Sequence, residues 1–212
     1  MENIYTIKTT KVGNTKVKNL YERAMSELID FYGVNWVKNT PRVYLVDSRE
    51  DFDLILACKT EPWVVGKVLS FNKILFLSPE SYQKESCHKY SDEEYFFLVK
   101  HELSHLFYMI FAKGNGPVWL DEGFAIYTSG ELETKDKPEK LTNFLDYYSY
   151  EDEDTYTESG FVIEGLIKKY GKEKVLKFIK KLNVIEKETD FKEEFEKYFG
   201  LNLEYKSIQD LL

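Results

Sequence analysis

The chain has 212 residues, of which 43% are hydrophobic and 31% are charged, and its formal net charge is −8. This length and composition fit a folded chain with a sizeable core and exclude an intrinsically disordered one. The negative net charge argues against a nucleic-acid binder that depends on a general basic field. No apolar run approaches the roughly 18 residues of a membrane span, and no basic start precedes an apolar segment. We therefore expect a cytoplasmic protein.

Strand patterns are confined to the first half of the chain. Residues 1–40 are expected to form an N-terminal helical segment, with an amphipathic helix over 16–32. Three runs rich in β-branched and aromatic residues follow, and they predict strands at 41–47, 63–70 and 73–78. Only two residues separate the last two runs, which is typical of a β-hairpin. A short helix, capped by Ser48, is expected between the first two runs.

Helical patterns dominate after residue 90. Ser91 and Glu94 form a capping box before a long apolar helix, which is expected to end near Gly114. Pro117 is well placed in the first turn of the next helix, which is expected to end near Gly130. Further helices are predicted at 138–148, 157–170, 172–182 and 189–199.

Strands followed by helices predict an α+β fold rather than an alternating α/β fold. Residues 41–212 are expected to form one compact domain with two lobes. A small β-containing lobe comes first, the long apolar helix is central, and the second lobe is helical. The central helix would form the floor of a groove between the lobes.

Two of the three histidines, His101 and His105, lie four residues apart on the predicted central helix. At that spacing both imidazoles project from one face and can reach a single tetrahedral zinc ion. Glu102 projects about 100° away, so it suits a metal-bound water better than the metal itself. This is the H-E-x-x-H arrangement. The alternative is a buried pair of histidines that are hydrogen-bonded to their neighbours.

A catalytic zinc ion takes three protein ligands and keeps one open position. Glu122, seventeen residues after His105, is the favoured third ligand, because a tight turn can bring its helix back beside the first. Asp121 is the competing candidate, since only one of the two adjacent carboxylates can face the metal. Gly123 costs about 1 kcal/mol in a helix and so predicts a close approach of another helix there.

These motifs resemble those of a known family. His101-Glu102-x-x-His105, followed by the sequence WLDEGFA at 119–125, resembles the gluzincin metallopeptidases and most of all the small peptidase-MA-like domains. The resemblance implies a zincin-like fold, a Zn²⁺ cofactor and a peptide or protein substrate. It also implies that His101, His105 and Glu122 bind the zinc and that Glu102 is the general base.

The chain departs from the family pattern in two places. It lacks the G-x-M-E-N-like stretch with which aminopeptidase relatives hold a free amino terminus, which favours an endopeptidase. Ile126 stands where some relatives carry an acidic residue that orients a zinc-bound histidine, so that partner is unassigned.

Relatives often stabilise the oxyanion with a later tyrosine or histidine. Tyr156 is the candidate here, although the aminopeptidase register places Thr157 at that position. The other candidates are Tyr147, Tyr148, Tyr150 and His88.

In zincins an edge strand pairs with the backbone of the substrate. The run at 73–78 is the candidate for that strand, with Lys73, Ile74, Leu75 and Phe76 as substrate-binding residues. The alternative is an ordinary core strand.

Two interpretations of the whole chain follow. The first is zinc-dependent hydrolysis of peptide bonds, with Glu102 as the general base. The second is a catalytically inactive, zinc-stabilised peptide- or protein-binding domain of the same fold. Two charged stretches are also notable. The acidic stretch at 131–154 is expected to be a solvated loop, and the alternative is a rim of the cleft that favours basic substrates or carrier surfaces. The basic amphipathic stretch at 168–181 is either a solvated lysine face or a contact surface for a membrane or an acidic partner.

Overall fold

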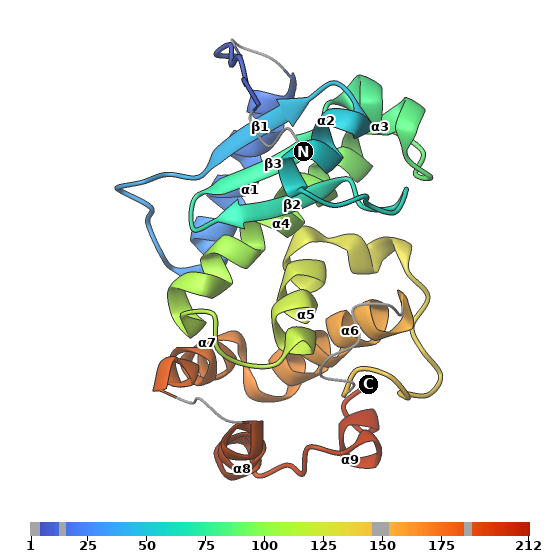
Figure 1. Cartoon of the computed structure of the whole chain (residues 1–212). Coiled ribbons are helices and arrows are strands. Elements are labelled where there is room, and N and C mark those ends of the chain that lie inside the picture. Colours follow the sequence, from blue (N-terminus) through green and yellow to red (C-terminus); the bar gives the residue numbers. More distant parts are fainter. Residues whose placement is uncertain (1–4, 13–15, 146–152, 185–187) are drawn as a thin grey trace.

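The computed structural model describes residues 5–12, 16–145, 153–184 and 188–212. The fold is α+β, as expected, with a small sheet and its helices at one end and a helical region at the other (Figure 1). Within the described ranges, no helix has the length and apolarity needed to cross a membrane.

The strands are β1 (Arg42–Val46), β2 (Gly66–Ser70) and β3 (Lys73–Leu77). The helices are α1 (Lys16–Tyr32), α2 (Arg49–Leu56), α3 (Pro79–Glu85), α4 (Asp92–Ala112), α5 (Val118–Ser129), α6 (Glu153–Tyr170), α7 (Lys172–Lys181), α8 (Glu188–Phe199) and α9 (Tyr205–Gln209), with 3-10 turns η1 (Glu131–Thr134) and η2 (Leu182–Val184).

The three strands form one sheet in the order β1-β3-β2. The predicted hairpin is confirmed, because β2 pairs antiparallel with β3. The expectation that β3 is an edge strand is wrong, because its other side pairs in parallel with β1. Its backbone therefore has no free edge for a peptide, and Ile74, Leu75 and Phe76 are fully buried. The substrate-binding assignment of these residues and Lys73 loses its basis. Among the strands of the described residues, the unpaired edge on this side of the sheet belongs to β2.

The central helix α4 has the predicted bounds. The Ser91 hydroxyl accepts a hydrogen bond from the Glu94 N–H at 3.0 Å and caps the helix start. The helix ends where Lys113 and Gly114 adopt the left-handed conformation. Helices α1, α5 and α7 and strand β2 all pack against α4, so its side chains are largely buried.

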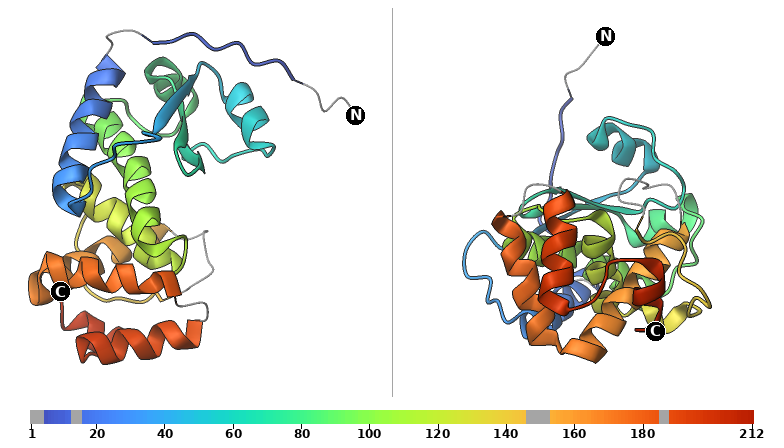
Figure 2. Two further views of the ribbon diagram at one scale, coloured as in Figure 1. Left: turned by 90° about the vertical axis from the view of Figure 1, so that its left-hand side faces the viewer. Right: turned by 90° about the horizontal axis from the view of Figure 1, so that it is seen from below.

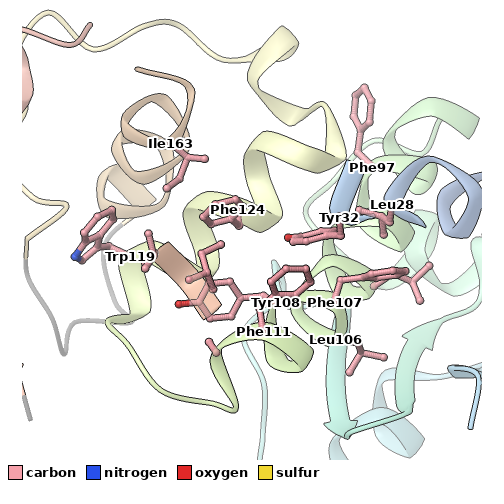
Figure 3. Packing of buried hydrophobic residues seen from close by; sticks show 14 of the residues in the cluster. Leu28, Tyr32, Phe97, Leu106, Phe107, Tyr108, Phe111, Trp119, Phe124 and Ile163 are labelled. Carbon is pink, nitrogen blue, oxygen red and sulfur yellow. The ribbon is translucent and has the colours of Figure 1, made fainter. Parts of the chain in front are cut away.

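Aromatic rings join α1, α4 and α5 into one core (Figure 3). The ring of Tyr32 on α1 stacks on Phe107 of α4, with a centroid separation of 5.4 Å, and lies beside Phe124 of α5. Its hydroxyl lies 2.9 Å from the Ser104 hydroxyl, to which Thr128 of α5 donates a hydrogen bond. The N-terminal helix thus shares the core of the domain and supports the stretch of α4 that carries both histidines.

Helices α5 and α6 approach closely, and two glycines make this possible. A Cβ atom on Gly123 would lie 2.6 Å from the Ser159 carbonyl oxygen, and one on Gly160 would lie 2.6 Å from Ile126. Both distances are shorter than a van der Waals contact, so a side chain at either position would push the helices apart. The close approach predicted from Gly123 is confirmed, and its neighbour is α6.

The predicted helix at 138–148 is wrong over 138–145, and its remainder lies outside the described residues. The buried Glu158 carboxylate accepts hydrogen bonds from the backbone N–H groups of residues 142–144, at 2.8 to 2.9 Å. A backbone N–H that donates to this carboxylate is not available for the i−4 carbonyl of a helix. The segment is therefore an irregular loop attached to α6.

Candidate metal centre

Three side chains from two helices converge beside α4. The Nε2 atoms of His101 and His105 lie 3.4 and 3.6 Å from the same carboxylate oxygen, Oε2 of Glu122. The two imidazole rings are 4.9 Å apart, and all three side chains are half-buried. The group forms because α5 returns beside α4 after the turn at Gly116 and Pro117, as the sequence predicts.

The spacing of these atoms fits a tetrahedral metal ion. Zinc–nitrogen and zinc–oxygen bonds of about 2.0–2.2 Å place neighbouring ligand atoms about 3.4 Å apart in a tetrahedron. The observed 3.4 and 3.6 Å agree with this value, and both exceed the usual length of an N–H···O hydrogen bond. Two imidazoles and a carboxylate suit zinc and several other divalent transition metals. His101, His105 and Glu122 can therefore hold one such ion.

The outer nitrogen of His101 is held by a residue that the sequence analysis missed. Its Nδ1 atom lies 2.8 Å from Oε1 of Glu131, in the 3-10 turn after α5. The Ser129 hydroxyl donates a hydrogen bond to the same oxygen at 3.0 Å. Between them, Gly130 has a φ of 99°, which lets the chain turn back toward α4. The one signal in the sequence is an acidic residue directly after this helix-ending glycine.

The outer nitrogen of His105 is held by Asp121. Its Nδ1 atom lies 2.7 Å from Oδ1 of Asp121, the residue considered as an alternative metal ligand. Asp121 therefore orients a ligand, and Glu122 faces the centre. Because carboxylates hold both Nδ1 atoms, the Nε2 atoms of His101 and His105 are left for a metal. The Ile126 side chain packs against α6 and offers no polar group to either histidine.

The local charges favour a cation between these groups. Burial lowers the pKa of both histidines, but the neighbouring carboxylates outweigh it. Glu131 and Glu122 raise the pKa of His101 well above its usual value, and Asp121 and Glu122 raise the pKa of His105 to about 9. Burial raises the pKa of the Glu122 carboxyl, but the two imidazoles lower that pKa by more, so the net change is downward. The centre thus attracts protons, which a bound metal ion would replace.

Glu102 lies beside this group without belonging to it. Its side chain is buried, and burial raises the pKa of its carboxyl, an effect that His105 and His101 partly offset. It also packs against β2, since a Cβ atom on Gly66 would lie 3.0 Å from Glu102 Cγ. The carboxyl therefore stands between the candidate metal ligands and the strand with the free edge.

The candidates for the oxyanion donor lie in different places. Tyr156 is half-buried in the first turn of α6, a helix that packs against α5, and its role stays a prediction. His88 lies with its Nε2 atom 3.0 Å from the Trp63 carbonyl oxygen, in the loop before β2. The candidate tyrosines at 147, 148 and 150 lie outside the described residues.

No protein-family model matches this chain, and no curated protein matches it either. The chemistry of the site must therefore be inferred from its own atoms. The fold brings together the two histidines, Glu122 and Glu102, and adds Asp121 and Glu131 as partners of the histidines.

Proposed function

We propose that this chain is a zinc-dependent endopeptidase of the gluzincin type, with a zincin-like fold. One observation carries the proposal. The Nε2 atoms of His101 and His105 and one oxygen of Glu122 surround a point at tetrahedral spacing, with a buried, unligated Glu102 beside it. A structural zinc site is closed by four protein ligands, whereas this group offers three among the described residues. Three ligands leave a position for water or substrate.

Bound zinc would lower the pKa of its water and polarise the substrate carbonyl. Glu102 would accept the proton from that water and pass it to the leaving amine. Its buried position suits this role, because burial raises the pKa of the carboxyl from that of an exposed glutamate toward neutral pH. Tyr156 would donate a hydrogen bond to the oxyanion.

The free edge of β2 is the place for an extended substrate. The Leu77 N–H donates a hydrogen bond to the Val65 carbonyl, so these residues form a hydrogen-bonded pair of the ladder. In the antiparallel alternation, the N–H and C=O groups of Gly66 and Val68 then face away from β3. A peptide that pairs with these groups would pass next to Glu102, which packs on Gly66. This edge replaces β3, which the sequence analysis had chosen.

The variant Glu102→Gln tests the general base, with Glu93→Gln on the exposed start of α4 as a matched control. The proposal predicts that the wild type and the control cleave peptides from a labelled library. Glu102→Gln should keep the metal and lose at least about 100-fold in kcat. If Glu102→Gln cleaves as fast as the control, Glu102 is not the base. If the wild type binds library peptides without cleaving them and Glu102→Gln binds equally well, the chain is the inactive binding domain instead.

A further inference from the structure

A dense group of lysines covers the end of α6 and the outer side of α7. Residues 168–181 hold seven lysines and one glutamate, in a chain whose net charge is −8. Helix α7 turns its apolar residues inward and packs on α8 through Phe178, on the outside of the helical region (Figure 2). The lysine surface is defined here by Lys168, Lys169, Lys172, Lys174, Lys177, Lys180 and Lys181.

Most of this positive charge is not neutralised within the described part of the chain. Lys168 pairs with Glu164 at 2.8 Å and Lys181 pairs with Glu194 at 2.5 Å. Among the described residues, the other five lysines of the surface form no ion pair. Five uncompensated ammonium groups close together repel one another, which costs stability unless an anion binds there.

Aromatic rings hold several of these ammonium groups in place without cancelling their charge. The Lys174 Nζ lies 4.8 Å from the ring centroid of Tyr170 and 5.6 Å from that of Tyr198. Lys172 lies over Phe31, and Lys180 lies over Phe111. Such cation–π contacts reduce the freedom of the lysine side chains, so less entropy is lost when a ligand binds them.

The lysine surface also contains an open hollow of about 630 Å³ between α7 and α8. Its lining combines three lysines with one glutamate and two tyrosines: Lys172, Lys174, Lys177, Glu173, Tyr170 and Tyr198. The three lysines can therefore reach one bound segment at the same time. The hollow offers ammonium groups for carboxylates and aromatic faces for the intervening chain.

From these observations we propose that the lysine surface binds an acidic polypeptide segment, rich in Asp and Glu, and that it does so independently of the metal centre. A membrane-binding surface would also need protruding apolar side chains. Of the exposed large apolar residues in the described part of the chain, Val184 alone is adjacent to α7 in the sequence. The chain's net charge of −8 repels a duplex nucleic acid more strongly than an acidic peptide, because a duplex carries about one negative charge per 1.7 Å of its length.

The test measures the binding of a fluorescein-labelled Glu/Asp-rich peptide to the full chain by fluorescence anisotropy. A peptide with Gln and Asn in place of Glu and Asp is the neutral control. The acidic peptide should bind, the neutral one should not, and added salt should weaken the binding. A metal chelator should have no effect, which separates this proposal from the proposed peptidase activity. If a chelator abolishes binding, the peptide binds at the metal centre and the proposal is wrong.

The triple variant Lys172→Gln/Lys174→Gln/Lys177→Gln should weaken binding by roughly tenfold, if each lysine contributes as a partly exposed ion pair does. The same three positions changed to Arg keep the charge and should retain binding, which controls for altered folding. Three exposed lysines elsewhere provide a charge-matched control, which should bind as the wild type does: Lys59→Gln/Lys84→Gln/Lys89→Gln.

Three further results would overturn the proposal. The first is equal affinity of the two Gln triple variants. The second is the absence of binding to the wild type. The third is tighter binding of anionic lipid vesicles or duplex DNA than of the acidic peptide.

Discussion

Nδ1 of His101 lies 2.8 Å from Oε1 of Glu131, thirty residues later in the chain. In the family that the motif resembles, some members place an acidic partner four residues after the third ligand, where this chain has Ile126. Here the partner comes from the turn after α5 instead, and Gly130 and Ser129 hold it in place. The chain therefore forms a carboxylate–histidine pair at its candidate metal centre with a carboxylate from a different position in the sequence.

Replacing Glu131 tests this pair. Glu131→Gln removes the carboxylate charge that fixes the His101 ring and makes it more basic, so metal affinity should fall by about 10- to 100-fold. Competition with a chromophoric chelator measures the affinity directly. Glu133→Gln, an exposed change two residues away, should leave it unaltered. Equal affinities for these two variants would show that Glu131 does not support the metal ligand.

Gly66 offers a test of the contact between β2 and the proposed base. In Gly66→Ala the new methyl group would lie 2.8 Å from the Phe76 ring and 3.0 Å from Glu102 Cγ. We expect a lower kcat with unchanged metal content and a loss of about 1–3 kcal/mol in the free energy of unfolding, as for other overpacked positions. Ser70→Ala on the same strand is the control. Unchanged kcat and stability in Gly66→Ala would mean that the contact is not tight.

Gly123 tests the approach of α5 and α6. An exposed helical Gly→Ala change usually stabilises a protein by about 0.5–1 kcal/mol, because glycine is the poorer helix former. At Gly123 the methyl group would meet the backbone oxygen of Ser159 at 2.6 Å, and a backbone atom cannot move aside cheaply. We therefore expect destabilisation by about 1–3 kcal/mol in denaturant unfolding. A stabilised Gly123→Ala variant would contradict the observed packing.

Replacing Glu158 tests the loop over 138–145, which the sequence patterns predict as a helix. Glu158→Ala removes the acceptor of the N–H groups of residues 142–144 and leaves them without this partner. We expect a loss of about 3 kcal/mol or more in the free energy of unfolding, because hydrogen bonds to charged groups contribute more than neutral ones. Glu158→Gln, which keeps one acceptor oxygen, should lose less. Equal stability of the alanine variant and the wild type would show that the carboxylate does not hold the loop.

Local patterns made much of this molecule predictable. The start of α4 depends on Ser91 and Glu94, three residues apart, and the histidine pair depends on one helical turn. The hairpin likewise depends on two adjacent runs and a two-residue turn. In each case the determining contacts lie within a few residues, so the sequence shows them directly.

The features that were missed depend on contacts between distant residues. The place of β3 in the middle of the sheet follows from its pairing with β1, about thirty residues earlier. Over 138–145 the predicted helix is replaced by a loop, because Glu158 accepts hydrogen bonds from the N–H groups of residues 142–144. The partnership of Glu131 with His101 depends on how α5 packs on α4. A pattern of spacing along the chain contains none of this information.

The most direct test of the central claim is the metal content of purified protein, measured by elemental analysis after zinc is added and the excess is dialysed away. The chain's third histidine, His88, provides the matched control, because its Nε2 atom lies by the Trp63 carbonyl in the loop before β2. We predict about one zinc per chain in the wild type and in His88→Ala, and loss of that zinc in His105→Ala. A wild-type protein that retains no zinc, or a His105→Ala variant that retains as much as His88→Ala, would contradict the account.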